Sequence, residues 1–141
     1  IEGKIVTTIG KNAFEDCSNL TSIKMPEKVT SIGTAAFRNC SSLTSIDIPE
    51  GVTSIGNFAF SRCGSLTNIN IPESVTNIEN FAFESCSSLT SIDIPKNVTN
   101  IGIEAFKYCT NLEVVIDNSK DNVNVGRDAF NKCKSVTWLK E

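Results

Sequence analysis

A short phrase, Ala-Phe-x-x-Cys, recurs along the whole chain at a nearly fixed interval. Its cysteines are 23 residues apart from Cys17 to Cys109, and the last step, from Cys109 to Cys133, is 24 residues. A fixed period of this length is typical of solenoids, in which each repeat buries its apolar residues against the next repeat. The phrase therefore indicates a structural unit. Its phenylalanines are Phe14, Phe37, Phe60, Phe83, Phe106 and Phe130, each preceded by an alanine.

Each repeat carries three apolar patterns in turn. Residues 43–48 read Leu-x-x-Ile-x-Ile, which has the alternation and the β-branched composition of a strand. Residues 52–55 supply a second apolar pair, and residues 59–63 have the three-residue spacing of a helical turn. We therefore predict a short strand, a corner, a second short extended segment and a short helical turn in every coil.

Prolines and glycines stand at the boundaries between these segments. A proline ends the first strand in four repeats, where a ladder donor would otherwise be needed. A glycine follows the second apolar pair in most repeats, which suggests positive φ or a close backbone approach, and Glu79 interrupts this series. The prolines are Pro26, Pro49, Pro72 and Pro95, and the glycines are Gly10, Gly33, Gly56, Gly102 and Gly126.

The fold class that follows is a repeat solenoid with a parallel β ladder along its axis, formed as a single domain by residues 1–141. The pattern opens in mid-repeat at Ile1 without an initiator methionine, so we expect an excised or processed fragment. The expected boundaries are a partial first repeat at 1–19, repeats at 20–42, 43–65, 66–88, 89–111 and 112–135, and a partial last repeat or cap at 136–141.

Composition argues against several classes of function. The net charge is -3 and the 13 basic residues are scattered, so we expect no nucleic-acid partner. The longest apolar runs are only a few residues, so we expect no membrane span. Histidine, the commonest general base and a frequent metal ligand, is absent. We therefore expect no catalytic residues, no cofactor and no metal site.

The stretch "LTSIDIPEGVTSIGNFAFSRC" (residues 43–63) resembles the BspA-like class of leucine-rich repeats, and the likeness covers nearly the whole chain. The resemblance implies a right-handed leucine-rich repeat coil in a non-enzymatic, surface-exposed or secreted protein of a bacterium or a parasitic protist. It also implies adhesion to extracellular matrix proteins such as fibronectin and fibrinogen. The family brings no catalytic residues, and a shared repeat defines a scaffold better than a ligand.

The outward positions of the first strand are where leucine-rich repeats commonly bind. Most are Ser, Asn or Asp, as at Ser91 and Asp93, but the C-terminal repeats place Val114, Ile116 and Trp138 there. We therefore predict an apolar cluster on this surface, which serves as a protein-binding site or is covered by a further coil or cap. In the same repeat Asp117 replaces the isoleucine found at Ile94.

Two further groups of side chains are candidates. Phe58 and Phe81 are expected to form a stacked, partly exposed pair beside the helical turns, which either packs against neighbouring coils or supports self-association. The six aligned cysteines lack the C-x-x-C pairs of a zinc site, and we expect buried free thiols.

These observations leave two functions open. The first is a binding module of a cell-surface or secreted adhesin, which uses the strand face against a host or partner protein. The second is a structural spacer in a longer array whose binding site lies elsewhere. Near-identical outward positions at Asp47, Asn70 and Asp93 favour the spacer, and the divergence nearer the C-terminus favours a site.

Overall fold

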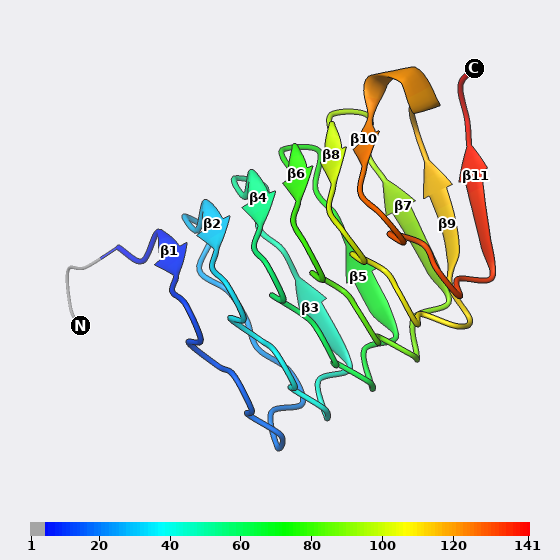
Figure 1. Ribbon diagram of the computed structural model, residues 1–141. Coiled ribbons are helices and arrows are strands. Elements are labelled where there is room, and N and C mark those ends of the chain that lie inside the picture. The colour runs from blue at the N-terminus through cyan, green and yellow to red at the C-terminus, as the bar shows by residue number, and fades with distance from the viewer. Residues whose placement is uncertain (1–4) are drawn as a thin grey trace.

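The computed structural model describes residues 5–141 and shows a parallel β-solenoid of about six coils, as predicted (Figure 1). The first and last described coils lie at opposite ends of the stack, and the short strands lie on one side of it and the longer strands on the other. Equivalent residues of successive coils are therefore neighbours along the axis.

The short strands pair in parallel to form one continuous sheet in the order β1-β2-β4-β6-β8-β10. Each contains two residues, of which the inward one, such as Ile55, is buried. The strands are β1 (Thr8–Ile9), β2 (Ser31–Ile32), β4 (Ser54–Ile55), β6 (Asn77–Ile78), β8 (Asn100–Ile101) and β10 (Asn124–Val125).

The longer strands line the other side of the coil and pair as β3-β5 and as β7-β9-β11. A bridge between Lys24 and Asp47 extends the first of these ladders into the preceding coil. Side chains alternate between the core and solvent, as the pleat requires. The strands are β3 (Ser45–Asp47), β5 (Asn68–Asn70), β7 (Ser91–Ile94), β9 (Glu113–Ile116) and β11 (Ser135–Trp138).

The Ala-Phe-x-x-Cys segments form consecutive β-turns, and the predicted helical turn is wrong. Cys17 N–H donates to the carbonyl of Phe14 and Ala13 N–H to that of Gly10, both at 3.2 Å and both across three residues. The third residue of each of these turns, Asn12 or Asp16, has positive φ, as in a type II turn. Within residues 5–141 the only helix is the 3₁₀ turn η1 (Lys120–Asn122).

This alternation of turns explains how the turn segments bond to one another along the axis. Every second N–H points out of its own coil: Ala35, Phe37 and Asn39 each donate at 2.8 Å to a carbonyl of the next coil. Inter-coil hydrogen bonding therefore continues through the turns as well as through the strands. Residues 11–17 and their equivalents in later coils are called the turn face below.

The core is a set of ladders of identical residues. Phe37 and Phe60 are fully buried, and their ring centroids lie 5.3 Å apart with an interplanar angle of 3°. The other neighbours in this ladder stack at 5.2 to 5.8 Å, and Ala, Cys, Leu and Ile residues form parallel ladders beside it. Each coil therefore buries its apolar residues only when a neighbour lies on both sides.

The glycines that follow β2, β4, β8 and β10 lie close to the backbone of the preceding coil. A Cβ on Gly56 would lie 2.7 Å from the carbonyl oxygen of Ile32, and one on Gly126 would lie 2.4 Å from the amide nitrogen of Ile103. Glu79 occupies the same place in the fourth coil, where its carboxylate accepts a hydrogen bond of 3.0 Å from Ser54. Of the two reasons considered from the sequence, crowding by the neighbouring coil is the one that applies.

Candidate protein-binding surface

The strand face, defined as the exposed side of β3, β5, β7, β9 and β11, follows from strand periodicity. Ser91 and Asp93 are exposed there, as predicted, because the intervening Ile92 points into the core. The exposed or half-buried residues of this face are Ser45, Asp47, Asn68, Asn70, Ser91, Asp93, Glu113, Val115, Ser135 and Thr137.

The predicted apolar cluster on this face is wrong. Val114 and Ile116 are 0% exposed, because they pair with Ile92 and Ile94 in the buried rows of the ladder. Trp138 pairs with Ile116, so it also belongs to a core row and is half-buried at the last strand. The side chains therefore complete the core and do not form a surface patch.

The error is one of register. Leu89 and Leu112 are both buried, but Ser91 pairs with Glu113, so β9 begins one residue sooner after its leucine than β7 does. A shift of one residue exchanges the two faces of a strand. Asp117 now follows the strand, at the place of Pro95, and its N–H donates to the carbonyl of Ile94 at 3.0 Å.

The shift gives the C-terminal part of the strand face a different chemistry. Carboxylates and apolar groups meet there in a groove of about 500 Å³, whose lining includes Asp93, Val115, Asp117 and Leu139. Leu139 is 58% exposed, and Lys140 bonds the Asp117 carboxylate at 2.8 Å. Sequence reasoning did not identify Val115, Asp117 and Leu139 as residues of this groove. The signal was available, because an isoleucine is buried more readily than an aspartate, and placing Ile116 in the core instead of Asp117 gives the shifted register.

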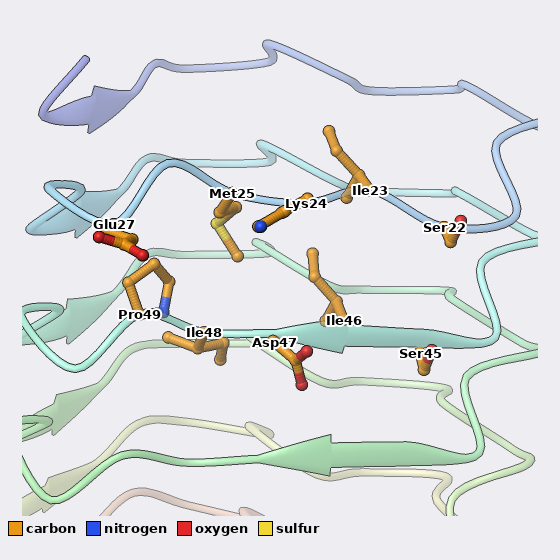
Figure 2. A pocket seen from close by; sticks show the side chains of 10 residues that line it. All are labelled: Ser22, Ile23, Lys24, Met25, Glu27, Ser45, Ile46, Asp47, Ile48 and Pro49. Atoms are coloured by element: carbon orange, nitrogen blue, oxygen red, sulfur yellow. The ribbon is translucent and has the colours of Figure 1, made fainter. Parts of the chain in front are cut away.

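A second groove, of about 450 Å³, opens at the N-terminal part of the same face. Figure 2 shows its lining, which comes from residues 22–27 and from the neighbouring segment at 45–49. Lys24 and Asp47 lie side by side there, and Glu27 adds a second carboxylate, so one cation and two anions line the groove.

The two grooves therefore differ in charge. Lys24 lines the N-terminal groove, whereas Glu73, Asp93 and Asp117 line the C-terminal groove and no basic residue of the described chain does. Lys140, which pairs with Asp117, lies at the rim of the C-terminal groove.

The turn face carries the aromatic pair that the sequence predicted. The rings of Phe58 and Phe81 are half-buried, with centroids 4.6 Å apart and an interplanar angle of 4°. Both residues have positive φ, an uncommon conformation for bulky side chains. Arg38 lies over the Phe58 ring at 4.9 Å and reaches Glu15 at 3.9 Å, so one outer face of the pair is covered. Self-association through this pair stays a prediction.

The six cysteines are free thiols, and the four in the middle of the stack are buried. Each thiol from Cys40 onward donates to the carbonyl of the phenylalanine one coil earlier, as Cys63 does to Phe37 at 3.1 Å. Burial raises the pKa of Cys63 to about 12 and that of Cys40 to about 11. Cys40 and Cys63 therefore stay neutral, and the thiols from Cys40 onward link adjacent coils.

Two features are not found in the part of the chain that the structure describes. Within residues 5–141, no group of three or more His, Cys, Asp or Glu side chains is placed to hold a metal ion. No helix in the same range is long and apolar enough to cross a membrane. The strand face is an extended polar surface, and the two grooves described above open on it.

Comparison with known proteins agrees with this description. Residues 7–137 match the model of the BspA type leucine rich repeat region, in six copies. The chain therefore belongs to the BspA-type leucine-rich repeat family, as the sequence indicated. Among curated proteins, none is significantly similar to it.

Several solved structures share the fold. The leucine rich repeat protein of T. pallidum is 31% identical with a TM-score of 0.74, over 82% of this chain and 57% of that one. A leucine rich cell surface protein of Faecalibacterium prausnitzii is also 31% identical, with a TM-score of 0.76, over 96% of this chain and 44% of that one. The pneumococcal vaccine antigen PcpA, at 24% identity and a TM-score of 0.70, shows the fold alone.

The chain spans about half the length of the first two of these structures. Repeat solenoids use their extended surfaces for binding. The fold and family thus define a repeat module suited to protein interaction.

Proposed function

We propose that this chain is a non-enzymatic protein-binding module of a cell-surface or secreted, adhesin-like protein, and that it contacts a host or partner protein through the strand face. The observation that carries the proposal is that the two grooves described above both open on this face. The cell-surface description of the Faecalibacterium relative supports an extracellular or surface location for this chain as well.

Within the strand face, the C-terminal groove is the preferred contact. Asp93 and Asp117 line it together with the half-buried Val115 and the exposed Leu139, so acidic and apolar groups lie side by side. Ser91 lies one strand position before Ile92 on the same exposed side as Asp93. Such a surface suits an extended protein segment that alternates basic and apolar residues. Extracellular matrix proteins such as fibronectin and fibrinogen are the proposed class of partner.

The test is binding of the chain to an immobilised panel of matrix proteins, with fibronectin and fibrinogen first. We expect saturable binding that Asp93→Arg weakens at least tenfold, because the substitution reverses a charge without touching the core. Glu50→Arg is the matched control, since Glu50 is exposed but does not line the groove. Trp138→Ser is less informative because Trp138 packs against the core, so it requires matched thermal stability.

A structural spacer is the second candidate, and one observation favours it. The exposed positions of β3, β5 and β7 are nearly the same, with Asp47, Asn70 and Asp93 in one row. A face that only separates other segments has no need to vary. Failure of wild type and Asp93→Arg to bind any member of the panel would favour the spacer over the binding module.

A further inference from the structure

We infer that the solenoid has a joint on its strand face between β5 and β7, where its two halves bend relative to each other and change the width of the C-terminal groove. The halves are residues 20–88, which include β5, and residues 89–135, which include β7. The joint is independent of the proposed function, and only its effect on binding rests on that function.

The strand ladder is interrupted between these two coils. Thr67 N–H donates to the carbonyl of Thr44 at 3.0 Å, and Glu113 N–H donates to that of Thr90 at 3.0 Å. The equivalent bond from Thr90 to Thr67 does not form, and the Thr67 carbonyl has no donor within residues 5–141. Of the strand-face junctions that the structure describes from residue 20 onward, only β5–β7 has neither a strand pair nor a bridge.

Proline removes the bond that would close the far end of this junction. Asp117 N–H donates to the carbonyl of Ile94 at 3.0 Å, which extends the ladder past β9. Pro95 stands at the equivalent place one coil earlier and has no N–H, so the Ile71 carbonyl has no donor within the described residues. Pro72 removes the same bond between β3 and β5, but three strand pairs join the coils there. The β5–β7 junction has no such pairs to compensate.

The same two coils are joined by backbone bonds along the opposite side. β6 and β8 pair in parallel (Figure 1), and Thr99 N–H donates to the carbonyl of Thr76 at 2.9 Å. On the turn face, Phe83 N–H donates to the carbonyl of Ala105 at 2.8 Å. Segments with few hydrogen bonds open at a low free-energy cost, whereas bonded segments move together. The bonded side is therefore the hinge, and the β5–β7 side is the part that opens.

Core contacts limit how far the joint opens. Leu66 and Leu89, which precede β5 and β7, are both 0% exposed and belong to the same core cluster. Beyond the strands, the Asn97 amide donates to the Glu73 carbonyl at 2.9 Å, which is a side-chain bond that tolerates small changes in spacing. We therefore expect a bend of small amplitude that leaves the core buried.

The C-terminal groove lies across the joint. Asn70 and Glu73 line it from one half, and Asp93 and Asp117 line it from the other. A bend changes the separation of the Glu73 and Asp93 carboxylates, and hence the attraction of both to one basic group of a partner. A partner that contacts both sides of the groove would favour one arrangement of the two halves.

The experiment is measurement of the residual dipolar couplings of the backbone amides of the free chain by NMR. We expect the two halves to require alignment tensors of different magnitude, because motion about the joint averages their couplings unequally. Residues 43–65 and 66–88, on either side of the intact β3–β5 ladder, are the internal control and should share one tensor. Equal magnitudes for the two halves would overturn the inference, because the solenoid would then be rigid between β5 and β7.

Pro95→Ala tests the cause of the joint. The variant supplies the N–H that Asp117 supplies one coil later, so the difference in magnitude between the two tensors should shrink at least twofold. Pro72→Ala is the matched control, because it adds an N–H where β3 and β5 already pair, and it should leave the difference unchanged. Amide spectra verify that both variants fold. A difference that persists in full in Pro95→Ala would overturn the inference, because the missing ladder would not be its cause.

These couplings also separate the joint from the proposed function, since they are measured without a partner. Two unequal tensors in a chain that binds no matrix protein would support the joint and count against the proposed function. A rigid chain that binds fibronectin or fibrinogen would overturn the joint alone.

Discussion

The interior coils and the two end coils share the Ala-Phe-x-x-Cys motif but differ in how completely its side chains are buried. Phe60 and Phe83 are fully buried between neighbouring rings, whereas Phe14 and Phe130 remain half-buried. The cysteines behave alike, since Cys63 and its interior equivalents are buried and Cys17 and Cys133 are not. In a solenoid, stability arises from contacts between nearest neighbours, so the same residue contributes less where one neighbour is missing.

Substitution of a core phenylalanine should give the largest difference between the two regions. We expect Phe60→Ala to lower the free energy of unfolding by about 3–5 kcal/mol, because it leaves a cavity between two rings. Phe14→Ala, at the N-terminal coil, should cost roughly half as much, since part of its ring is already exposed. Urea unfolding at a concentration where the chain is monomeric measures both values.

Equal losses for the two phenylalanines would contradict the comparison, because they would mean that the end coil is as well packed as the interior. Phe130→Ala provides a second end position, with the ring 5.8 Å from that of Phe106 on its inner side.

Glycine substitutions test the same comparison through crowding. Gly56→Ala should cost about 1–3 kcal/mol, as overpacking does, because its Cβ would lie 2.7 Å from a backbone oxygen of the preceding coil. Gly10→Ala should change the stability of the monomer by less than about 0.5 kcal/mol, since its Cβ meets nothing within 4 Å. Thermal unfolding of the two variants at low concentration checks this, and a loss at Gly10 as large as that at Gly56 would refute it.

The solenoid, its period and its core ladders could be predicted from the sequence because one phrase repeats and its apolar positions recur. The register of β9 could not be read from the cysteine spacing alone. The strand begins one residue earlier after Leu112 than β7 does after Leu89. The segment between β9 and β10, which contains η1, is longer than the equivalent segment between β7 and β8. The two changes nearly cancel, so the distance from Cys109 to Cys133 is only one residue longer than the other steps. The decisive physical signal was Asp117, whose burial in the core would have been costly.

The turns were less predictable for a different reason. Asn12 and Asp16 tolerate positive φ, but Ala35, Phe58 and Phe81 adopt it without any signal in their residue type. Their conformation is imposed by bonding to the next coil, which a single repeat cannot reveal. The candidate site differs from the predicted one because of the register of β9. The shift of one residue buries Val114 and Ile116 and leaves Val115 and Asp117 to line the groove together with Leu139.

The buried thiols allow a test by pH. Burial raises the pKa of Cys63 from 9.0 to about 12. The contribution of the Cys63 thiol to the free energy of unfolding is therefore fully present below pH 9. It is lost as the pH rises from 9 toward 12, because in this range the thiol ionises in the unfolded chain and not in the folded one. We expect the stability lost in Cys63→Ala to shrink by about 1 kcal/mol between pH 9 and pH 10, since the thiol of the unfolded chain is only half ionised at pH 9 and the full slope of about 1.4 kcal/mol per pH unit is reached above it.

Chemical unfolding of wild type and Cys63→Ala at the two pH values measures the difference. Val52→Ala is the matched control, because it removes buried apolar volume at a position that does not titrate. The prediction fails if Cys63→Ala and Val52→Ala each lower the free energy of unfolding by the same amount at both pH values. That result would show that burial does not protect the Cys63 thiol from ionisation.

The smallest expected effect is at the boundary between the end coil and the interior on the turn face. Arg38 contacts the Phe58 ring at 4.9 Å on one side and Glu15 at 3.9 Å on the other, so it links the first coil to the third. At exposed sites a cation over an aromatic ring is worth about 0.5–1 kcal/mol. We expect a coupling of that size between Arg38→Met and Phe58→Leu in a double-mutant cycle, and Glu15→Gln should add little because surface ion pairs contribute little. A coupling near zero would mean that Arg38 only covers the ring, and the stability of the turn face would then rest on its backbone hydrogen bonds and on the Phe58–Phe81 stack.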